Sequence, residues 1–189
     1  MMQVDSRDRT VSPGFANGVA LTLLLLLVWG AGAVLMHVRG AGVDQLLEDI
    51  IAVPTPWLLL VGLASIIVHE ALHALGLRVL AGIQWTDIRF GIAWRGLAAY
   101  AHTDKSMSAR SYRWSAALPG LLLGVAPLVV GLARNSSLLA LYGALFTAMA
   151  GGDFAVLWVM RAIPADAVVV DSAHRAGCTV LALPPEVGG

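Results

Sequence analysis

The chain has 189 residues, of which 58% are hydrophobic and 13% are charged, and its formal net charge is zero. A typical soluble domain has about 25% charged residues, so this composition indicates an integral membrane protein. The neutral balance lacks the basic signature of a nucleic-acid-binding protein. The single cysteine, Cys178, excludes an internal disulfide framework and a zinc site built from several cysteines, and we expect a buried or interfacial thiol.

Four apolar stretches are each near the length of about 20 residues that a helix needs to cross a bilayer. Prolines in the third stretch are tolerated in such helices, because neighbouring groups satisfy the freed backbone. The sequence therefore predicts an α-helical polytopic membrane protein with about four transmembrane helices in a single membrane-embedded domain, residues 1–189. The expected spans are residues 15–38, 57–82, 115–132 and 137–160.

The first apolar stretch has two interpretations. Arg7 and Arg9 precede it, and Ala31-Gly32-Ala33 resembles the cleavage site of a signal peptide. The apolar run continues beyond that site to Met36, which favours a retained transmembrane helix.

Basic residues predict the orientation of the spans, because loops rich in Lys and Arg face the cytoplasm. An inside N-terminus places most of the basic residues on the cytoplasmic side, and only Arg39 and Arg134 fall outside. We therefore expect both termini in the cytoplasm, with residues 161–189 as a cytosolic tail.

The loop between the first two spans carries apolar residues on one helical face and acidic residues on the other, over residues 43–51. This pattern predicts a short helix that lies in the outer interface or packs on the bundle as a lid. Thr55-Pro56 is the expected N-cap and first position of the next helix.

Apolar residues alternate from Ile88 to Trp94, which is typical of a strand. Arg95-Gly96 offers a turn, and residues 97–102 supply a second strand. We therefore expect a short cytosolic β-hairpin between helices two and three.

The tail contains two further β-like runs, residues 167–170 and 178–183. Asp171 and His174 lie between these runs, and a solvated turn explains both of them.

The second span contains His69-Glu70-Ala71-Leu72-His73 at a depth where lipid favours hydrocarbon. Residues four apart lie on one side of a helix, so the two imidazoles can close on one tetrahedral zinc ion. Glu70 can then reach a water on that metal and take its proton. Insertion of an ionisable group into a span costs roughly 2.5–3.5 kcal/mol, so such groups usually indicate a function. The alternative to a metal site is that these side chains form polar contacts that join helices.

A zinc site of this kind needs a third protein ligand and an open position. Asp153 is the candidate inside the membrane, because at about 1.5 Å per residue it lies as deep in the fourth span as His69 and His73 in the second. Gly151 and Gly152 would let a neighbouring backbone approach closely. The alternative for Asp153 is a polar contact between helices.

His102 ends the second predicted strand, where it could fold back into the mouth of the site. It is a second candidate ligand, but we favour a polar adjunct of the active site or of substrate binding, or an interfacial histidine. His37 lies at the outer end of the first span, on the opposite side of the predicted membrane.

Together these features resemble the zincin peptidase family of small polytopic membrane proteins, which is related to the intramembrane site-2 protease class of zinc metalloproteases. The likeness covers most of the chain from about residue 57 onward. The fourth span departs from well-studied site-2 proteases, because it lacks their asparagine and its aspartate follows Gly-Gly. The resemblance rests on HEALH at 69–73, AYAHTDKSMS at 99–108, ALPG at 117–120, AGGDF at 150–154 and VVVDSAHRAGCTV at 168–180.

The residues and the resemblance favour an intramembrane zinc metalloprotease, with Zn²⁺ on His69, His73 and Asp153 and Glu70 as general base. The expected partners are a membrane protein or peptide substrate and the lipid bilayer, with no nucleic acid. The resemblance implies the cell membrane of a prokaryote. Two alternatives stay open: a non-catalytic metal-binding scaffold or regulatory protein, and a metal-ion carrier, which would need further ligands along a span.

Overall fold

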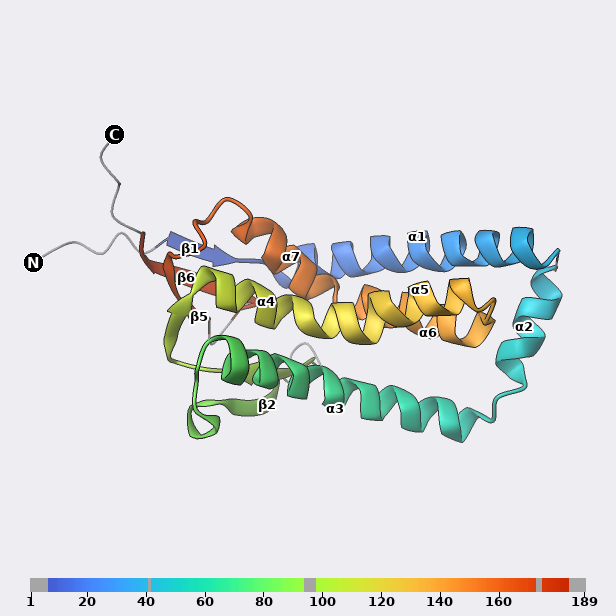
Figure 1. Ribbon diagram of the computed structural model, residues 1–189, viewed down its shortest axis with the longest axis horizontal. Helices are drawn as coiled ribbons and strands as arrows, with labels where there is room; N and C mark the ends of the chain where they lie inside the picture. Colours follow the sequence, from blue (N-terminus) through green and yellow to red (C-terminus); the bar gives the residue numbers. More distant parts are fainter. Residues whose placement is uncertain (1–6, 41, 94–97, 173–174, 184–189) are drawn as a thin grey trace, which may run out of the picture.

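The computed structural model describes residues 7–40, 42–93, 98–172 and 175–183. Its long helices run side by side along one axis, and its strands gather at one end of the molecule (Figure 1). The short helix α2 lies across the opposite end. The molecule therefore has a helical body with a small β-structure at one end.

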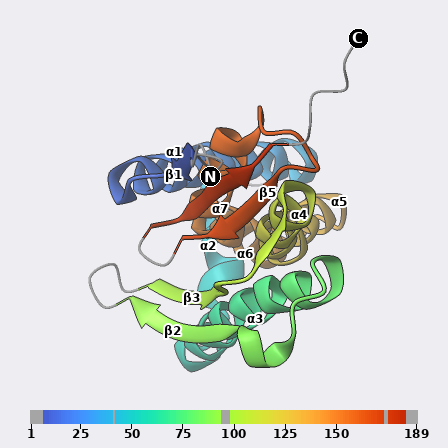
Figure 2. The same cartoon turned by 90° about the vertical axis from the view of Figure 1, so that its left-hand side faces the viewer.

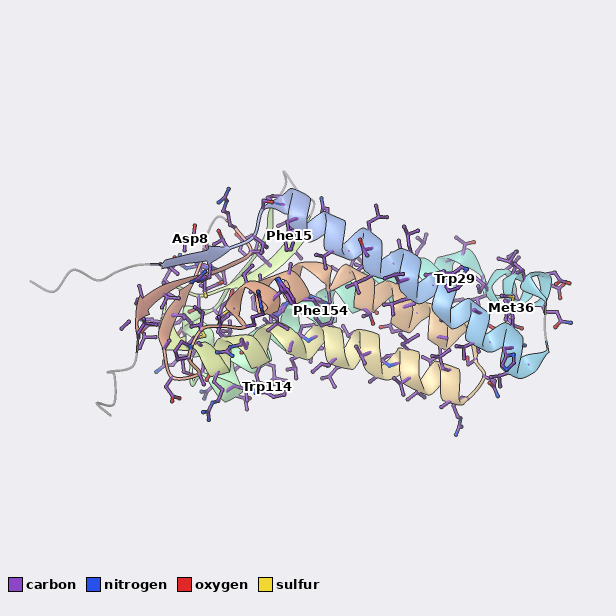
Figure 3. The ribbon with its side chains drawn as sticks, turned by 90° about the horizontal axis from the view of Figure 1, so that it is seen from above. Asp8, Phe15, Trp29, Met36, Trp114 and Phe154 are labelled. Atoms are coloured by element: carbon purple, nitrogen blue, oxygen red, sulfur yellow. The ribbon has the colours of Figure 1, made fainter. Side chains whose placement is uncertain are left out.

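Helix α1 spans Pro13–Arg39, and Phe15, Trp29 and Met36 mark its length in Figure 3. It begins where Ser12 Oγ accepts a hydrogen bond from the Phe15 N–H at 3.2 Å. It is continuous through residues 31–33 and packs against α6 and α7. Most of its apolar side chains face outward, and Trp29 is 77% exposed.

Helix α2, Val43–Ile51, confirms the predicted short helix between the first two long helices. It buries Leu46 against the bundle, and its Asp49 Oδ2 lies 2.7 Å from Arg39 Nη1 and 2.7 Å from Ser137 Oγ. These bonds join α2 to the end of α1 and to the start of α6. Helix α2 therefore contacts the bundle, while Val43, Leu47 and Ile51 stay exposed, and its place in the outer interface stays a prediction.

Helix α3 spans Thr55–Leu80, and its start corrects the predicted cap. Pro54 is the N-cap, and its carbonyl accepts a hydrogen bond from the Trp57 N–H at 2.9 Å. Thr55 is already helical and makes no side-chain cap bond. The rigid φ of Pro54 sets the start of the helix, so the Thr55 hydroxyl is not needed.

The third long helix covers Ala109–Ala133 and begins earlier than the predicted residue 115. Ser108 caps it, because its Oγ accepts a hydrogen bond from the Ser111 N–H at 3.1 Å. It consists of α4, Ala109–Pro119, a π-helical segment η2, Gly120–Val125, and α5, Ala126–Ala133. The wider π-turn follows Pro119, which has no N–H to continue the regular bonding.

The predicted fourth span is divided into two helices, α6, Ser137–Met149, and α7, Gly151–Met160, which are bent by 50° at the break. Gly151 lies against the Ala20 backbone of α1, where a Cβ would come within 2.6 Å. Gly152 meets only the Ala16 Cβ at 4.0 Å. Close approach therefore requires a glycine at residue 151 but not at 152.

Among the described residues, three helices are long and apolar enough to cross a membrane, or four if the bent pair forms one span. The prediction of a polytopic helical architecture agrees with this count. The difference is that the fourth candidate is broken rather than straight.

The predicted hairpin is present as strands β2, Arg89–Ala93, and β3, Ala98–His102, which are antiparallel with Arg89 opposite His102. A 3₁₀ turn, η1, Trp85–Asp87, leads into it from α3. Figure 2 shows this hairpin beside α3, apart from the other strands. The predicted turn at Arg95-Gly96 lies outside the described residues.

A four-stranded antiparallel sheet has the order β1-β6-β5-β4. The two tail runs form β5, Val168–Asp171, and β6, Gly177–Ala182, as their sequences indicate. Strands β1, Arg7–Thr10, and β4, Ser106–Ser108, were not predicted. Both are short and polar, and pairing with the tail rather than local pattern makes them strands.

The main core lies between this sheet and the adjoining ends of α3, α4 and α7. It is continuous from the sheet to the helices, so the tail is part of the folded domain. Its larger buried members are Val11, Leu77, Ile83, Ile88, Met107, Tyr112, Val156, Met160, Ile163, Val169, Cys178 and Val180.

We predict that Cys178 resists alkylation in the folded protein. Its side chain is fully buried with its Sγ 3.6 Å from Met160 Sδ, and burial raises the pKa of the thiol to about 12. Thiolate is the reactive form, so modification should require opening of the sheet. Mass spectrometry after iodoacetamide treatment, with and without denaturant, measures this, and rapid labelling of the folded protein would contradict it.

Candidate metal centre

The two histidines of the second long helix lie one turn apart on the same side of α3. Their ring centroids are 4.9 Å apart, and the ring planes meet at 77°. Both histidine side chains are mostly buried, and the helix around them is otherwise apolar. The i, i+4 spacing of His69 and His73 therefore produces one shared polar spot on this helix.

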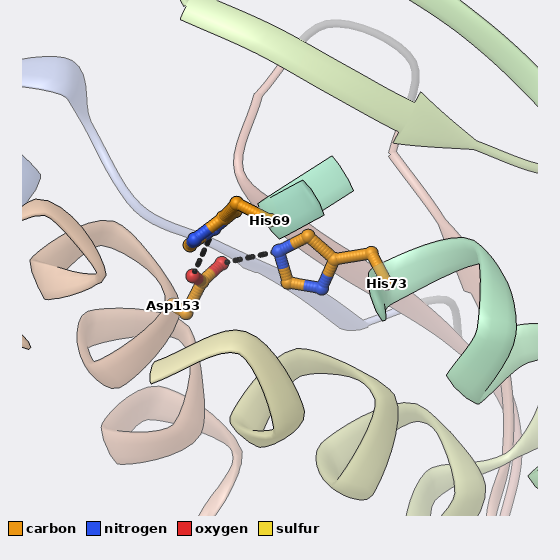
Figure 4. Close-up of side chains that lie close together, drawn as sticks. All are labelled: His69, His73 and Asp153. Atoms are coloured by element: carbon orange, nitrogen blue, oxygen red, sulfur yellow. Dashed lines mark ion pairs between the residues drawn. The ribbon is translucent and has the colours of Figure 1, made fainter. Parts of the chain in front are cut away.

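Asp153 comes from α7 and faces both histidines (Figure 4). Its Oδ2 lies 3.2 Å from His69 Nε2, and its Oδ1 lies 3.4 Å from His73 Nε2. One ligand atom from each residue falls within 4.8 Å of the others, so the three side chains could hold a metal ion. The structure thus brings together the three residues that were predicted as ligands, while metal binding itself stays a prediction.

The bend in the predicted fourth span determines where Asp153 lies. The new helix starts at Gly151, so Asp153 occupies its first turn. A carboxylate is favoured there, because the unpaired N–H groups give a helix N-terminus a partial positive charge. The break therefore turns Asp153 toward the histidines and also places its carboxylate at a favourable helix N-terminus.

His73 is oriented from behind by the third long helix. Its Nδ1 lies 2.9 Å from the backbone carbonyl oxygen of Ser115. In a regular α-helix this carbonyl would accept from the residue four positions later, which is Pro119 and has no N–H. The next amide, of Gly120, bonds to Ala117 instead. Pro119 therefore leaves the Ser115 carbonyl free to accept from His73.

Close packing of α3 on α4 brings His73 to this carbonyl. Gly76 lies against Ser115, and a Cβ at Gly76 would come within 2.8 Å of the Ser115 Cα. A larger residue would push the two helices apart. The contact of Gly76 with Ser115 therefore sets the distance from His73 to its backbone partner.

The carbonyl partner fixes the protonation of the His73 ring. A carbonyl oxygen only accepts, so Nδ1 carries the proton and Nε2 of the neutral ring presents a lone pair. That lone pair faces the Asp153 carboxylate, an arrangement that needs a cation or a proton between them. Two imidazole nitrogens and a carboxylate oxygen fit a divalent metal such as zinc, and a backbone partner on the other nitrogen is usual for metal-bound histidine.

Glu70 follows His69 directly and is partly buried beside the cluster. Strand β3 packs beside α3, the helix that carries Glu70. The hairpin therefore contacts this helix through its second strand.

His102 does not join the metal cluster, and the structure argues against it as a ligand. Its Nδ1 lies 2.7 Å from Asp171 Oδ2, and its Nε2 lies 2.9 Å from Asp104 Oδ1. Both nitrogens are therefore already bonded to carboxylates. His102 is the last residue of β3, and its role as a polar adjunct of the site stays a prediction.

Asp171 was missed by the sequence analysis, which placed it in a solvated turn. It is the last residue of β5, and its Oδ1 accepts from the Tyr112 hydroxyl at 3.0 Å. No local pattern marks it, because its partners come from β3 and α4. His174, predicted in the same turn, lies outside the described residues.

Comparison with known proteins gives one family. A family profile whose description is "Putative zincin peptidase" matches residues 62–168, which is more than half of the chain. The matched segment contains all three residues of the cluster and Glu70. Searches of curated proteins and of solved structures gave no match.

We predict that Pro119→Ala weakens metal binding. An alanine N–H can bond to the Ser115 carbonyl within the helix, so His73 has to compete for its partner. Loss of such a partner typically lowers metal affinity about 10- to 100-fold. Competition with a chromogenic zinc chelator measures the affinity of the purified protein.

Pro127→Ala is the matched control, because Pro127 lies in α5 after the π-segment and away from His73. We expect this variant to bind zinc like the parent. Equal affinities for the parent and both variants would show that the freed carbonyl does not orient His73.

Proposed function

Since the chain belongs to this zincin peptidase family, we propose that it is an intramembrane zinc metallopeptidase related to the site-2 proteases. The observation that carries the proposal is the convergence of His69, His73 and Asp153 from helices that are long and apolar enough to cross a membrane. A metal site between such helices acts on a bond that is presented within the bilayer.

The surface of α3 supports insertion into a membrane. Residues 55–61 are all exposed, and they make more than one full helical turn, so no side of this stretch is covered by protein. Full burial of a large apolar side chain is worth about 1.5–3 kcal/mol, so such a surface is unfavourable in water and stable in lipid. It consists of Trp57, Leu58, Leu59, Leu60 and Val61.

His69, His73 and Asp153 are the proposed ligands of Zn²⁺. When bound, zinc polarises the scissile carbonyl and makes water more acidic. The Ser115 carbonyl holds His73 in the ligating tautomer, and the first turn of α7 is a favourable position for the Asp153 carboxylate.

Glu70 is the proposed general base and then general acid. It takes the proton of the attacking water and gives it to the leaving amine.

The substrate class we propose is a helical segment of a membrane protein. A helix hides its amides in its own hydrogen bonds, so the segment has to unwind before cleavage. Strands β2 and β3 lie beside the site and expose Phe90, Ile92 and Tyr100, which suits an extended segment added by β-augmentation.

Charge supports an orientation in which the sheet end faces the cytoplasm. The sheet end carries most of the basic residues, whereas Arg39 and Arg134 lie at the ends of α1 and α5 near α2. Water would then enter from the cytoplasmic side, which is nearer to the metal centre.

Glu70→Gln should lower the rate of cleavage by about 10²-fold or more, because an amide cannot take the proton of water. Co-expression with a panel of tagged single-span membrane proteins, followed by immunoblotting, measures cleavage. The variant should retain its zinc, because no proposed ligand changes. Cleavage at the rate of the parent would overturn the peptidase assignment, and zinc binding without any cleavage by the parent would favour a metal-binding scaffold.

Asp153→Ala tests the third ligand separately. We expect the purified variant to lose most of its zinc, because two imidazoles alone leave the tetrahedral site incomplete. Metal content by plasma mass spectrometry, beside thermal unfolding, gives the result. Full zinc retention in a folded variant would show that Asp153 is a packing residue.

A further inference from the structure

His102 is a buried histidine at the junction between the hairpin and the four-stranded sheet. The residue is 8% exposed, and both of its ring nitrogens face carboxylates. An ionised carboxylate only accepts hydrogen bonds, so two ionised carboxylates favour an imidazolium that donates from both nitrogens. Burial opposes this charge, but the hydrogen bonds to Asp104 and Asp171 outweigh it, and the pKa of His102 is raised.

The two carboxylates differ in their surroundings. The Asp104 side chain is 57% exposed and pairs with Arg89, itself largely exposed, at 3.1 Å. The Asp171 side chain is only 16% exposed. Solvent weakens the interaction of His102 with the exposed Asp104 more than its interaction with the buried Asp171. Asp171 is therefore the partner that holds His102 in place.

Asp171 joins three separate elements of the fold. Its carboxylate accepts from His102 of β3, from the Tyr112 hydroxyl of α4 at 3.0 Å, and from the Ser172 N–H at 3.0 Å. Helix α4 also carries the Ser115 carbonyl that orients His73. A single side chain in the tail therefore connects the hairpin with the helix behind the metal centre.

The hairpin carries this connection to α3. Ala101 precedes His102 in β3 and packs against the main core, and β3 contacts α3, the helix that carries Glu70. Among the described strands, β3 pairs only with β2, so strand pairing does not fix it to the four-stranded sheet. The bond from His102 to Asp171 joins β3 to β5 of that sheet through side chains, beside the short link of residues 103–105 to β4.

We propose that Asp171 is a positioning residue, which holds β3 beside Glu70 through His102 and so makes the C-terminal sheet part of the peptidase machinery. This inference rests on the proposed role of Glu70. Asp171 also lies beyond residues 62–168, the segment matched by the family profile.

Hydrogen–deuterium exchange on the full chain in detergent micelles tests the attachment without any substrate. In Asp171→Asn we expect the amides of residues 98–102 to exchange about tenfold faster, because β3 opens locally more often. Asp104→Asn is the matched control, with the same chemical change on the exposed side of the same ring, and should stay within about twofold of the parent. Equal exchange in all three proteins would overturn the attachment.

A ligand of the metal centre tests whether the effect passes through Glu70. Acetohydroxamate binds a metal and offers a hydroxyl to a neighbouring carboxylate, and titration of the Co²⁺-loaded protein by visible absorption gives its Kd. We expect about tenfold weaker binding in Asp171→Asn and in Glu70→Gln, and no further loss in the double variant. The Co²⁺ spectrum itself should not change, because the ligands are intact. Additive losses would show that Asp171 does not act through Glu70.

Tyr112→Phe keeps the inference testable if Asp171→Asn does not fold. It removes one donor from Asp171 and keeps the ring, so exchange of residues 98–102 should rise about two- to threefold. No change in this variant would count against the positioning role. A parent protein that binds no Co²⁺ would refute the proposed metal centre, whereas the exchange comparison would still decide the role of Asp171.

Discussion

The imidazole of His73 requires a partner at each of its nitrogens, because an unpaired polar group among apolar helices is costly. One partner is the Ser115 carbonyl, which is free because Pro119 has no N–H. The other side faces Asp153, which reaches the site because the last long helix is bent. The π-segment after Pro119 and the break before α7 have the same effect, because each lets a polar group reach the His73 ring.

The sequence was sufficient wherever periodicity or depth determines position. The four-residue spacing in HEALH places His69 and His73 on one side of a helix in any fold that keeps the helix. Counting residues from the outer ends of two helices predicted that Asp153 lies at the same level. Alternating apolar residues predicted the hairpin, because strand geometry has a period of two.

Other features depend on contacts between distant segments, which no local pattern records. Arg7–Thr10 becomes a strand because β6 is beside it, although its sequence is polar. Asp171 looks like a turn residue until His102 and Tyr112 are placed around it. Gly151 and Gly152 indicate close packing, but the 50° bend follows from how α7 fits against α1. The helices and the cluster were therefore predictable, whereas the residues that support the cluster were not.

The sheet order β1-β6-β5-β4 has a consequence for how the protein is made. Its first strand leaves the ribosome before any helix, and β5 and β6 follow every helix. Strand β1 can pair with β6 only after the whole helical bundle has been synthesised. Pairing of two strands that lie so far apart in the sequence is slow. The helices can therefore be in place before Asp171 reaches His102, so the hairpin is fastened late. The hairpin beside α3 would in this way take its final place only after all the helices of the chain have been made.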